Sequence, residues 1–208
     1  MNIETLEVGP IGTNCYVVWG DASQALVIDP GGDAPAIMKA VKGHRLSIAV
    51  YLLTHGHMDH ISALADMYDL APAPIAIHAA DLAWAFEDVN TLWPVYTTAP
   101  RRPPKIDRVL ADGQDFTDAG LKCRVIHTPG HTPGGVCFHF TDERVLFTGD
   151  TLFAGSVGRT DLNGGDPRVL TRSLTLLTRL PDVTAIYPGH GPDTTLAQEK
   201  KSNYFLRA

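Results

Sequence analysis

The sequence has no apolar run approaching the ~18 residues that a membrane span requires. Its first four residues carry neither the basic nor the apolar stretch of a secretory signal. Cysteine is scarce, with three residues at widely separated positions and no Cys-x-x-Cys pair. An odd, dispersed set of this kind indicates a reducing compartment. We therefore expect a cytoplasmic protein that makes no membrane contact.

Positive charge is also limited, because 17 Lys and Arg residues stand against 23 Asp and Glu residues and the net charge is −6. Without a run of Lys or Arg, the chain is a poor candidate for binding the phosphates of nucleic acid, and we expect no nucleic-acid partner. Apolar residues make up 44% of the chain and charged residues 19%, which excludes intrinsic disorder. A length of 208 residues fits one domain, 1–208.

Short apolar and β-branched runs bounded by Gly, Pro or Asp predict strands in both halves of the chain. The expected strands are 3–8, 14–19, 25–28, 48–53, 75–77, 109–111, 122–127, 136–141, 145–148 and 184–187. Helices are expected after Asp33, through Leu64 and Met67, over 79–87 and over 166–180. Because strands dominate each half and helices follow them, the sheets should lie inside and the helices outside. The Pro-rich segment 89–108 is expected to be a long loop, a candidate lid over a site.

The most informative segment follows the strand predicted at 48–53. It reads Thr-His-Gly-His-Met-Asp-His and contains His55, His57, Asp59 and His60. Three imidazoles and a carboxylate within six residues are the nitrogen and oxygen donors that zinc, iron or manganese accept. A merely solvated loop rarely concentrates these side chains, so the segment predicts a metal site.

Three further candidate ligands each follow a predicted strand and adjoin a glycine. They are His131 in Thr-Pro-Gly-His-Thr-Pro-Gly, Asp150 in Thr-Gly-Asp, and His190 in Pro-Gly-His-Gly. Glycine lets the backbone approach a buried ion closely. Any one of these residues alone could as well be structural, but together with the first segment they make a set of seven.

Seven donors exceed the needs of one tetrahedral ion and suit two. We expect His55, His57 and His131 on one ion, Asp59, His60 and His190 on the other, and Asp150 bridging both. Two ions about 3.5–4 Å apart can share a water whose pKa falls toward ~7, so that hydroxide is available near neutral pH. Asp29, at the end of another predicted strand, either holds a ligand imidazole in one tautomer or is simply a turn residue before Pro-Gly-Gly.

At this point the chain resembles the metallo-β-lactamase fold hydrolases, whose pattern is THGHMDH, TPGHTPG, TGD and PGHG in that order. The resemblance implies an α/β fold, an αββα sandwich of two mixed sheets with metals at their edge. The segments Gly-Asp-Thr-Leu-Phe at 149–153 and Gly-Arg-Thr-Asp at 158–161 are similar to the glyoxalase II-like branch. The helical glutathione-binding domain of the larger glyoxalase II enzymes is not expected here, since only a short tail follows Gly191. Where the commonest zinc β-lactamases use a Cys, this sequence has Asp150, so antibiotic hydrolysis is not expected.

The resemblance implies a two-metal hydrolase of a small-molecule thioester, with S-lactoylglutathione the first expectation. Zinc is the first expectation for the metals, and iron or manganese fit the same ligands. Asp59 would also orient the hydroxide and take up its proton. Arg159 and Arg207 match glutathione-contacting positions, although Arg159 could instead pair with Asp161. The alternatives are an iron persulfide dioxygenase with one iron on His55, His131 and Asp150, and a metal-binding protein without turnover; the sequence does not predict an oligomeric state.

Overall fold

Two mixed six-stranded sheets form the centre of the protein, seen here in a computed structural model that describes residues 1–207. The first sheet is ordered β1-β2-β3-β4-β5-β6, with antiparallel pairing up to β3 and parallel pairing from β3 onward. Its strands are β1 (Asn2–Val8), β2 (Thr13–Trp19), β3 (Gln24–Ile28), β4 (Ser47–Leu52), β5 (Ile75–His78) and β6 (Arg108–Leu110).

The second sheet is ordered β14-β13-β10-β9-β8-β7, and only β10 and β13 pair in parallel. Its strands are β7 (Asp115–Asp118), β8 (Leu121–His127), β9 (Val136–Phe140), β10 (Val145–Gly149), β13 (Ala185–Pro188) and β14 (Thr194–Thr195). A small hairpin of β11 (Leu152–Phe153) and β12 (Ser156–Val157) follows β10.

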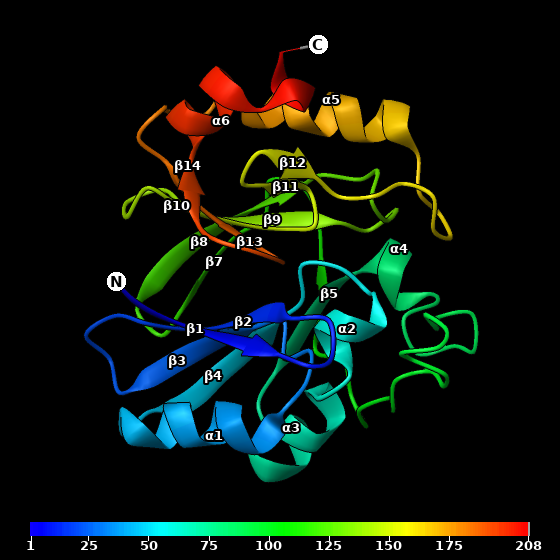
Figure 1. Ribbon diagram of the computed structural model, residues 1–208. Helices are drawn as coiled ribbons and strands as arrows, with labels where there is room; N and C mark the ends of the chain where they lie inside the picture. The colour runs from blue at the N-terminus through cyan, green and yellow to red at the C-terminus, as the bar shows by residue number, and fades with distance from the viewer. Residues whose placement is uncertain (208) are drawn as a thin grey trace.

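Helices cover the outer face of each sheet (Figure 1). On the first sheet these are α1 (Ala34–Gly43) and α3 (Leu64–Leu70), and on the second α5 (Pro167–Leu177) and α6 (Leu196–Ser202). The short helices α2 (Met58–Ile61) and α4 (Ala79–Leu82) and the 3-10 turn η1 (Tyr204–Leu206) complete the fold. The layer order confirms the predicted αββα sandwich. No helix of the described residues is long and apolar enough to cross a membrane.

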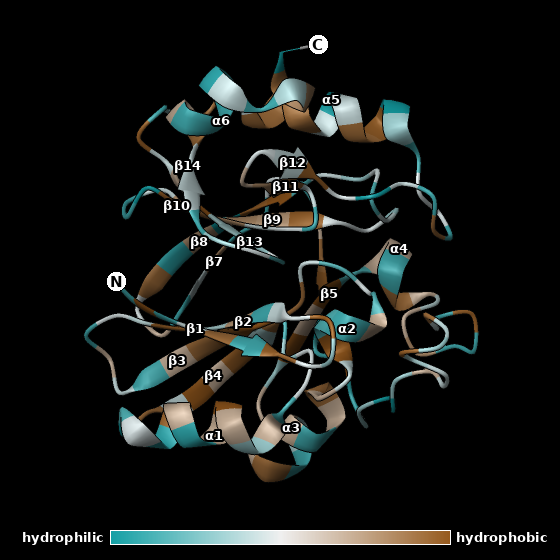
Figure 2. Cartoon of the chain, viewed as in Figure 1, coloured by the Kyte–Doolittle hydropathy of each residue, from teal (hydrophilic) through white to brown (hydrophobic). Residues whose placement is uncertain are grey.

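Period-two alternation sends neighbouring strand residues into different apolar layers. On β2, Val17 packs toward α1 and α3, while Val18 packs between the sheets. The layer between the sheets contains Leu52 from the first sheet and Phe138 and Phe147 from the second. In Figure 2, β9 is almost wholly hydrophobic, whereas the helices carry both hydrophobic and hydrophilic residues. The second half of β4 is buried on both faces, because Tyr51 packs toward α1 and α3 while Val50 and Leu52 pack between the sheets, as its continuous apolar sequence predicts.

The helix expected over 79–87 forms only as its first turn, and the prediction is wrong beyond Leu82. α4 ends at Leu82, and the chain then turns. The amide of Asn90 donates to the carbonyls of Ala85 and Gly56, at 2.6 and 2.8 Å, and so takes up a carbonyl that a longer helix would use itself. Segment 89–108 is a loop up to β6, as expected.

The layer between the sheets provides a test of the fold. Phe138→Ala removes a fully buried ring and should lower the free energy of unfolding by about 3–5 kcal/mol, the usual cost of such a cavity. Chemical denaturation measures this change. Val183→Ala, at a site 60% exposed, is the control and should change stability by less than about 0.5 kcal/mol. A loss below about 1 kcal/mol for Phe138→Ala would contradict its place in the core.

Candidate metal centre

All seven predicted ligands meet at one edge of the sandwich, although they come from four separate segments of the chain. His55 and His57 follow β4, and Asp59 and His60 lie on α2. The other three follow β8, β10 and β13, and are His131, Asp150 and His190. These side chains are largely buried, and the most exposed of those that form ion pairs is His190, at 26%. The edge where strands from both sheets end thus holds a dense set of polar groups.

The first cluster consists of His55, His57 and His131, whose ligand atoms all lie within 4.8 Å of one another. Its closest pair is His57 Nδ1 and His131 Nε2, 2.8 Å apart. The three rings stand roughly edge-to-face, with interplanar angles between 78° and 90°. Their nitrogens therefore converge on one small volume.

The second cluster consists of Asp59, His60 and His190, and its ligand atoms also lie within 4.8 Å of one another. Asp59 Oδ2 is 3.1 Å from His190 Nε2 and 3.3 Å from His60 Nε2. Two imidazoles and one carboxylate here are chemically distinct from the three imidazoles of the first cluster. These are the residues that ligand counting assigned to the second ion, and a further group of neighbouring donors, Asp29, His55 and His60, overlaps both clusters.

Asp150 lies between the two clusters. Its Oδ2 is 3.4 Å from His131 Nε2 and 3.7 Å from His190 Nε2, and its Oδ1 is 3.3 Å from His60 Nε2. A Cβ on Gly189 would stand 2.1 Å from Asp150 Oδ1, so this position admits only glycine. The carboxylate of Asp150 consequently faces both clusters at once.

The neighbours of two histidines determine which ring nitrogen carries hydrogen. His131 Nδ1 lies 2.6 Å from the Arg159 carbonyl, and His190 Nδ1 lies 3.2 Å from the Gly12 carbonyl. A carbonyl can only accept, so both rings donate through Nδ1. Their Nε2 atoms are therefore directed toward the centre of the site.

Asp29 fixes two further rings. His60 Nδ1 lies 3.0 Å from Asp29 Oδ2, to which the Thr54 hydroxyl also donates at 2.6 Å. The Thr54 oxygen is thereby left to accept from His55 Nδ1 at 3.1 Å. Asp29 has a positive φ of 52°, a conformation that Asp tolerates, and it also accepts from the backbone N–H of Thr54 at 2.8 Å. The sequence left Asp29 as either a turn residue or an imidazole partner, and both descriptions apply.

The buried polar atoms of the site fit a cation. His55 Nε2, His60 Nε2 and Asp150 Oδ1 are buried without a hydrogen-bond partner. Leaving such an atom unsatisfied costs about 1–3 kcal/mol, and more for a charged group. Neutral imidazole and carboxylate donors around these atoms are the ligands that divalent transition metals prefer. The donor set therefore suits divalent metal ions in both clusters.

The protonation states differ between the clusters. Burial lowers the pKa of His55 well below its usual value and that of His57 to about 3, which keeps both imidazoles neutral. Burial opposes charge on His60 too, but the carboxylates of Asp59, Asp150 and Asp29 raise its pKa well above the usual value. A proton on His60 therefore competes with a metal for the second cluster.

Sequence reasoning missed Asp81, a buried residue of α4 that joins the two ligand loops. Its carboxylate accepts from the backbone N–H of Gly56 at 2.8 Å, from that of Gly134 at 2.6 Å and from the Thr132 hydroxyl at 2.7 Å. Burial raises the pKa of Asp81, although these three donors oppose the rise. No local pattern around Asp81 signals this role, because its partners lie 25, 51 and 53 residues away.

Thr13 and Asn14, at the start of β2, hold the second cluster. The Thr13 hydroxyl donates to Asp59 Oδ2 at 3.0 Å. The Asn14 amide donates to the carbonyls of Pro188 and Gly191, at 3.0 and 2.8 Å, on either side of His190. Neither residue was predicted to belong to the site, because no metal-ligating pattern marks this part of the sequence.

The clusters open into a cleft of about 310 Å³. His57, Asp59, His131, Asp150 and His190 line it together with apolar side chains that include Ile11, Leu92, Phe153 and Val157. Leu92 belongs to the 89–108 loop, so this segment forms part of the wall. The cleft gives a small molecule access to both clusters.

The two arginines expected to bind substrate lie in different places. Arg159 lines the cleft, but its guanidinium pairs with Asp161 through contacts of 2.6 and 2.7 Å, which is the alternative that the sequence left open. Arg207 is exposed and lines neither this cleft nor the neighbouring cavity between α5 and η1. The structure thus brings Arg159, but not Arg207, to the cleft.

A family model, a curated relative and solved structures each match most or all of this chain. Residues 8–190 match the model of the metallo-beta-lactamase superfamily. Hydroxyacylglutathione hydrolase GloC of Haemophilus influenzae is 36% identical over 220 residues, which cover 100% of this chain and 99% of that protein. The crystal structure of the BLEG-1 B3 metallo-beta-lactamase superposes with a TM-score of 0.92 at 37% identity, covering 100% of both chains. TTHA1623, solved in a di-iron-bound form, superposes with a TM-score of 0.87 at 37% identity, covering 99% of this chain and 100% of that one.

The position of Asp150 predicts that it contributes to both metal sites. Asp150→Asn keeps the shape of the side chain but removes its charge, and we expect the purified protein to lose most of its metal. Elemental analysis after zinc loading and desalting measures the metal per chain. Asp142→Asn, at an exposed site, is the matched control and should keep two equivalents. Two tightly held metals in Asp150→Asn would show that the carboxylate does not bridge the clusters.

The contacts of Asp81 predict that replacing this residue weakens metal binding indirectly. In Asp81→Asn, an NH₂ group must face one of three donors, so the loops carrying His57 and His131 should shift. Loss of such supporting contacts typically weakens metal binding about 10- to 100-fold, which competition with a chelating dye can measure. Asp88→Asn, exposed on the following segment, is the control. Unchanged affinity in a folded Asp81→Asn protein would remove Asp81 from the site.

Proposed function

The chain belongs to the metallo-beta-lactamase superfamily, and we propose that it is a metal-dependent hydrolase of thioesters, acting on S-lactoylglutathione or a related hydroxyacyl thioester. The observation that carries the proposal is the pair of donor clusters, joined by Asp150, on the floor of an open cleft. The similarity over nearly the full length to a hydroxyacylglutathione hydrolase supports the choice of substrate.

In this proposal His55, His57 and His131 hold one divalent ion, Asp59, His60 and His190 hold the other, and Asp150 contacts both. Zinc is the first choice, and iron or manganese suit the same donors. When bound, such ions lower the pKa of water and polarise a carbonyl oxygen. No Ser or Cys nucleophile is then required, which agrees with the burial of the three cysteines.

Asp59 is the residue proposed to orient the attacking water and to take up its proton. Its carboxylate lines the cleft, and its Oδ2 is held by the Thr13 hydroxyl at 3.0 Å and faces His190 Nε2 at 3.1 Å. Burial would raise the pKa of Asp59, but the charge of His60 and the contacts with His190 and His60 lower it, so the group is ionised. A thiolate leaves readily, so the cleft needs no strong acid at the leaving group.

Arg159 is proposed to bind a carboxylate of the thiol moiety. Its pair with Asp161 is exposed, with 54% and 67% of the two side chains accessible. Exposed ion pairs are weak, so an incoming carboxylate can displace Asp161 and use the same bidentate geometry. The Arg159 backbone meanwhile keeps its contact with His131.

A parallel assay on metal-analysed protein tests the proposed function. We expect hydrolysis of S-lactoylglutathione with two metals per chain, and no oxygen uptake with glutathione persulfide. Oxygen uptake with one iron per chain would replace the hydrolase with a dioxygenase. A penicillin and a cephalosporin are included because BLEG-1 is described as a B3 metallo-beta-lactamase. Turnover of these compounds without thioester hydrolysis would also contradict the proposal.

Arg159→Ala separates substrate binding from support of the site. We expect KM for the glutathione thioester to rise about tenfold with a smaller fall in kcat, because the lost contact is remote from the reacting carbonyl. A small thioester without carboxylates should be nearly unaffected. Asp161→Asn is the matched variant and should leave KM unchanged or lower it, since it frees the guanidinium. Equal losses on both substrates would make Arg159 a structural residue.

A further inference from the structure

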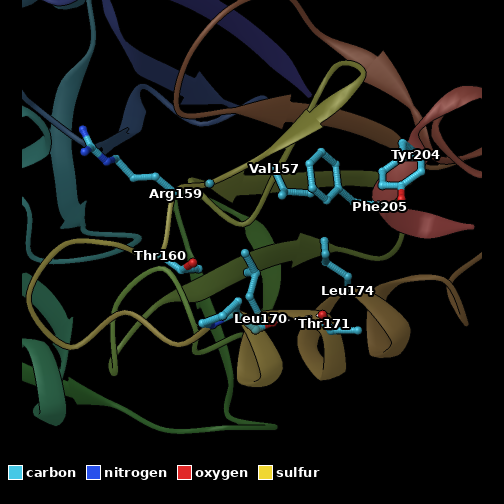
Figure 3. A pocket seen from close by; sticks show the side chains of 10 residues that line it. Val157, Arg159, Thr160, Leu170, Thr171, Leu174, Tyr204 and Phe205 are labelled. Carbon is cyan, nitrogen blue, oxygen red and sulfur yellow. Dashed lines mark hydrogen bonds between the residues drawn. The ribbon is translucent and has the colours of Figure 1, made fainter. Parts of the chain in front are cut away.

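A second cavity, of about 340 Å³, adjoins the metal cleft and shares Val157 and Arg159 with it. One wall is α5, through Leu170, Thr171 and Leu174, and the opposite wall is the aromatic pair Tyr204 and Phe205 of η1. Figure 3 shows Val157 and Phe205 facing each other, with the α5 side chains directed toward the space beside them. The cavity is therefore a side chamber of the cleft.

The chamber is apolar. Among the residues that the structure describes, Arg159 is the one charged residue in its lining, and Figure 3 shows the Arg159 side chain pointing away from the aromatic pair. Its guanidinium pairs with Asp161. The space between α5 and η1 offers no cation to a carboxylate of glutathione. A hydrocarbon chain placed there would instead be stabilised, because its apolar surface would be removed from water.

The aromatic wall is held in place by buried polar side chains. The Asn203 amide donates to the Ser156 carbonyl at 3.0 Å and to Glu199 Oε2 at 2.8 Å, and the backbone N–H of Phe205 donates to Asn203 Oδ1 at 3.0 Å. Glu199 Oε2 also accepts from the backbone N–H of Gly155, at 2.8 Å. Both Glu199 and Asn203 are at most 1% exposed, so the tail is fixed to the β11–β12 hairpin that leads into the cleft.

This anchoring leaves the aromatic rings open to solvent. Tyr204 is 76% exposed and Phe205 45% exposed, although backbone hydrogen bonds from Leu206 to Asn203 and from Arg207 to Tyr204 close the turn that carries them. Apolar and aromatic side chains held open beside a concave pocket are typical of ligand sites. The lactoyl group is short and polar and makes no use of such a wall.

We propose that this chamber binds an apolar acyl chain, so that the substrates include thioesters with acyl groups of several carbons. The inference rests on the proposed thioester hydrolysis. With the thioester carbonyl at the metal clusters, the thiol moiety extends toward the Arg159 guanidinium and the acyl chain passes Val157 into the space between α5 and η1. Arg159 thus binds the polar thiol moiety of the substrate, and the aromatic wall contacts the apolar acyl chain.

Two threonines of α5 provide a matched pair of variants. Thr171 lines the chamber and Thr175 does not, yet both are exposed and each donates its hydroxyl to the carbonyl four residues earlier, at 2.9 Å. Thr171→Trp should fill the chamber, whereas Thr175→Trp adds the same bulk outside it. Tyr204→Ala, which removes a largely exposed ring, is a second variant that should not disturb folding.

The test measures kcat/KM for acetyl, butyryl, hexanoyl and octanoyl thioesters of glutathione with the metal-loaded protein. In the unaltered chain and in Thr175→Trp, we expect a rise of about threefold per methylene until the chamber is full, in keeping with the free energy of burying a CH₂ group. In Thr171→Trp the octanoyl-to-acetyl ratio should fall at least tenfold, and in Tyr204→Ala at least threefold. No rise with chain length, or equal ratios in the two tryptophan variants, would overturn the chamber assignment.

Binding of thioethers, which cannot be hydrolysed, separates this inference from the proposed function. S-octylglutathione should bind at least tenfold more tightly than S-methylglutathione by calorimetry, and Thr171→Trp should remove the difference. If that result holds while no thioester is hydrolysed, the chamber stands and the thioesterase proposal fails. If S-lactoylglutathione is hydrolysed but the two thioethers bind equally, the proposed function stands and the chamber assignment fails.

Discussion

The arrangement of this protein depends on the enclosure of imidazole nitrogens and carboxylate oxygens in one small volume. His57 Nδ1 and His131 Nε2 lie 2.8 Å apart, and Asp150 faces the imidazoles of His60, His131 and His190. Such groups are costly to bury unless a cation neutralises them. The buried atoms without partners at His55, His60 and Asp150 mark where that cation is required.

The sandwich fold makes this enclosure possible because it brings distant chain segments to one edge. Tight turns after β4, β8, β10 and β13 supply the histidines and Asp150, while Asp29, which directly follows β3, fixes two of the rings. Asp81 then joins the two loops that carry the first cluster. The rigidity of the site therefore comes from carboxylates that face away from it as much as from the seven residues that face into it.

The seven site residues and the layered fold could be predicted because their signals are local. The ligands lie in short segments that follow apolar strands, five of the seven adjoin a glycine, and strand alternation separates the layers. Asp81 could not be predicted, because its partners lie far along the chain and its neighbours suggest an ordinary helix. The strand β7 was missed because its sequence, Asp-Phe-Thr-Asp, has one apolar residue. The pairing of Arg159 with Asp161 remained open, since sequence cannot choose between an internal partner and a ligand.

The central claim is that both clusters bind metal, the first through imidazoles that burial keeps neutral and the second through imidazoles able to hold an added proton. In the second cluster, carboxylates raise the pKa of His60 and His190 against the effect of burial. Metal must therefore displace protons there, and its apparent affinity should rise with pH. The most direct test is calorimetric titration of the metal-free protein with zinc near neutral pH, in two buffers of different ionisation enthalpy. The account predicts two equivalents bound with net proton release, whereas a single equivalent, or two without proton release, would contradict it.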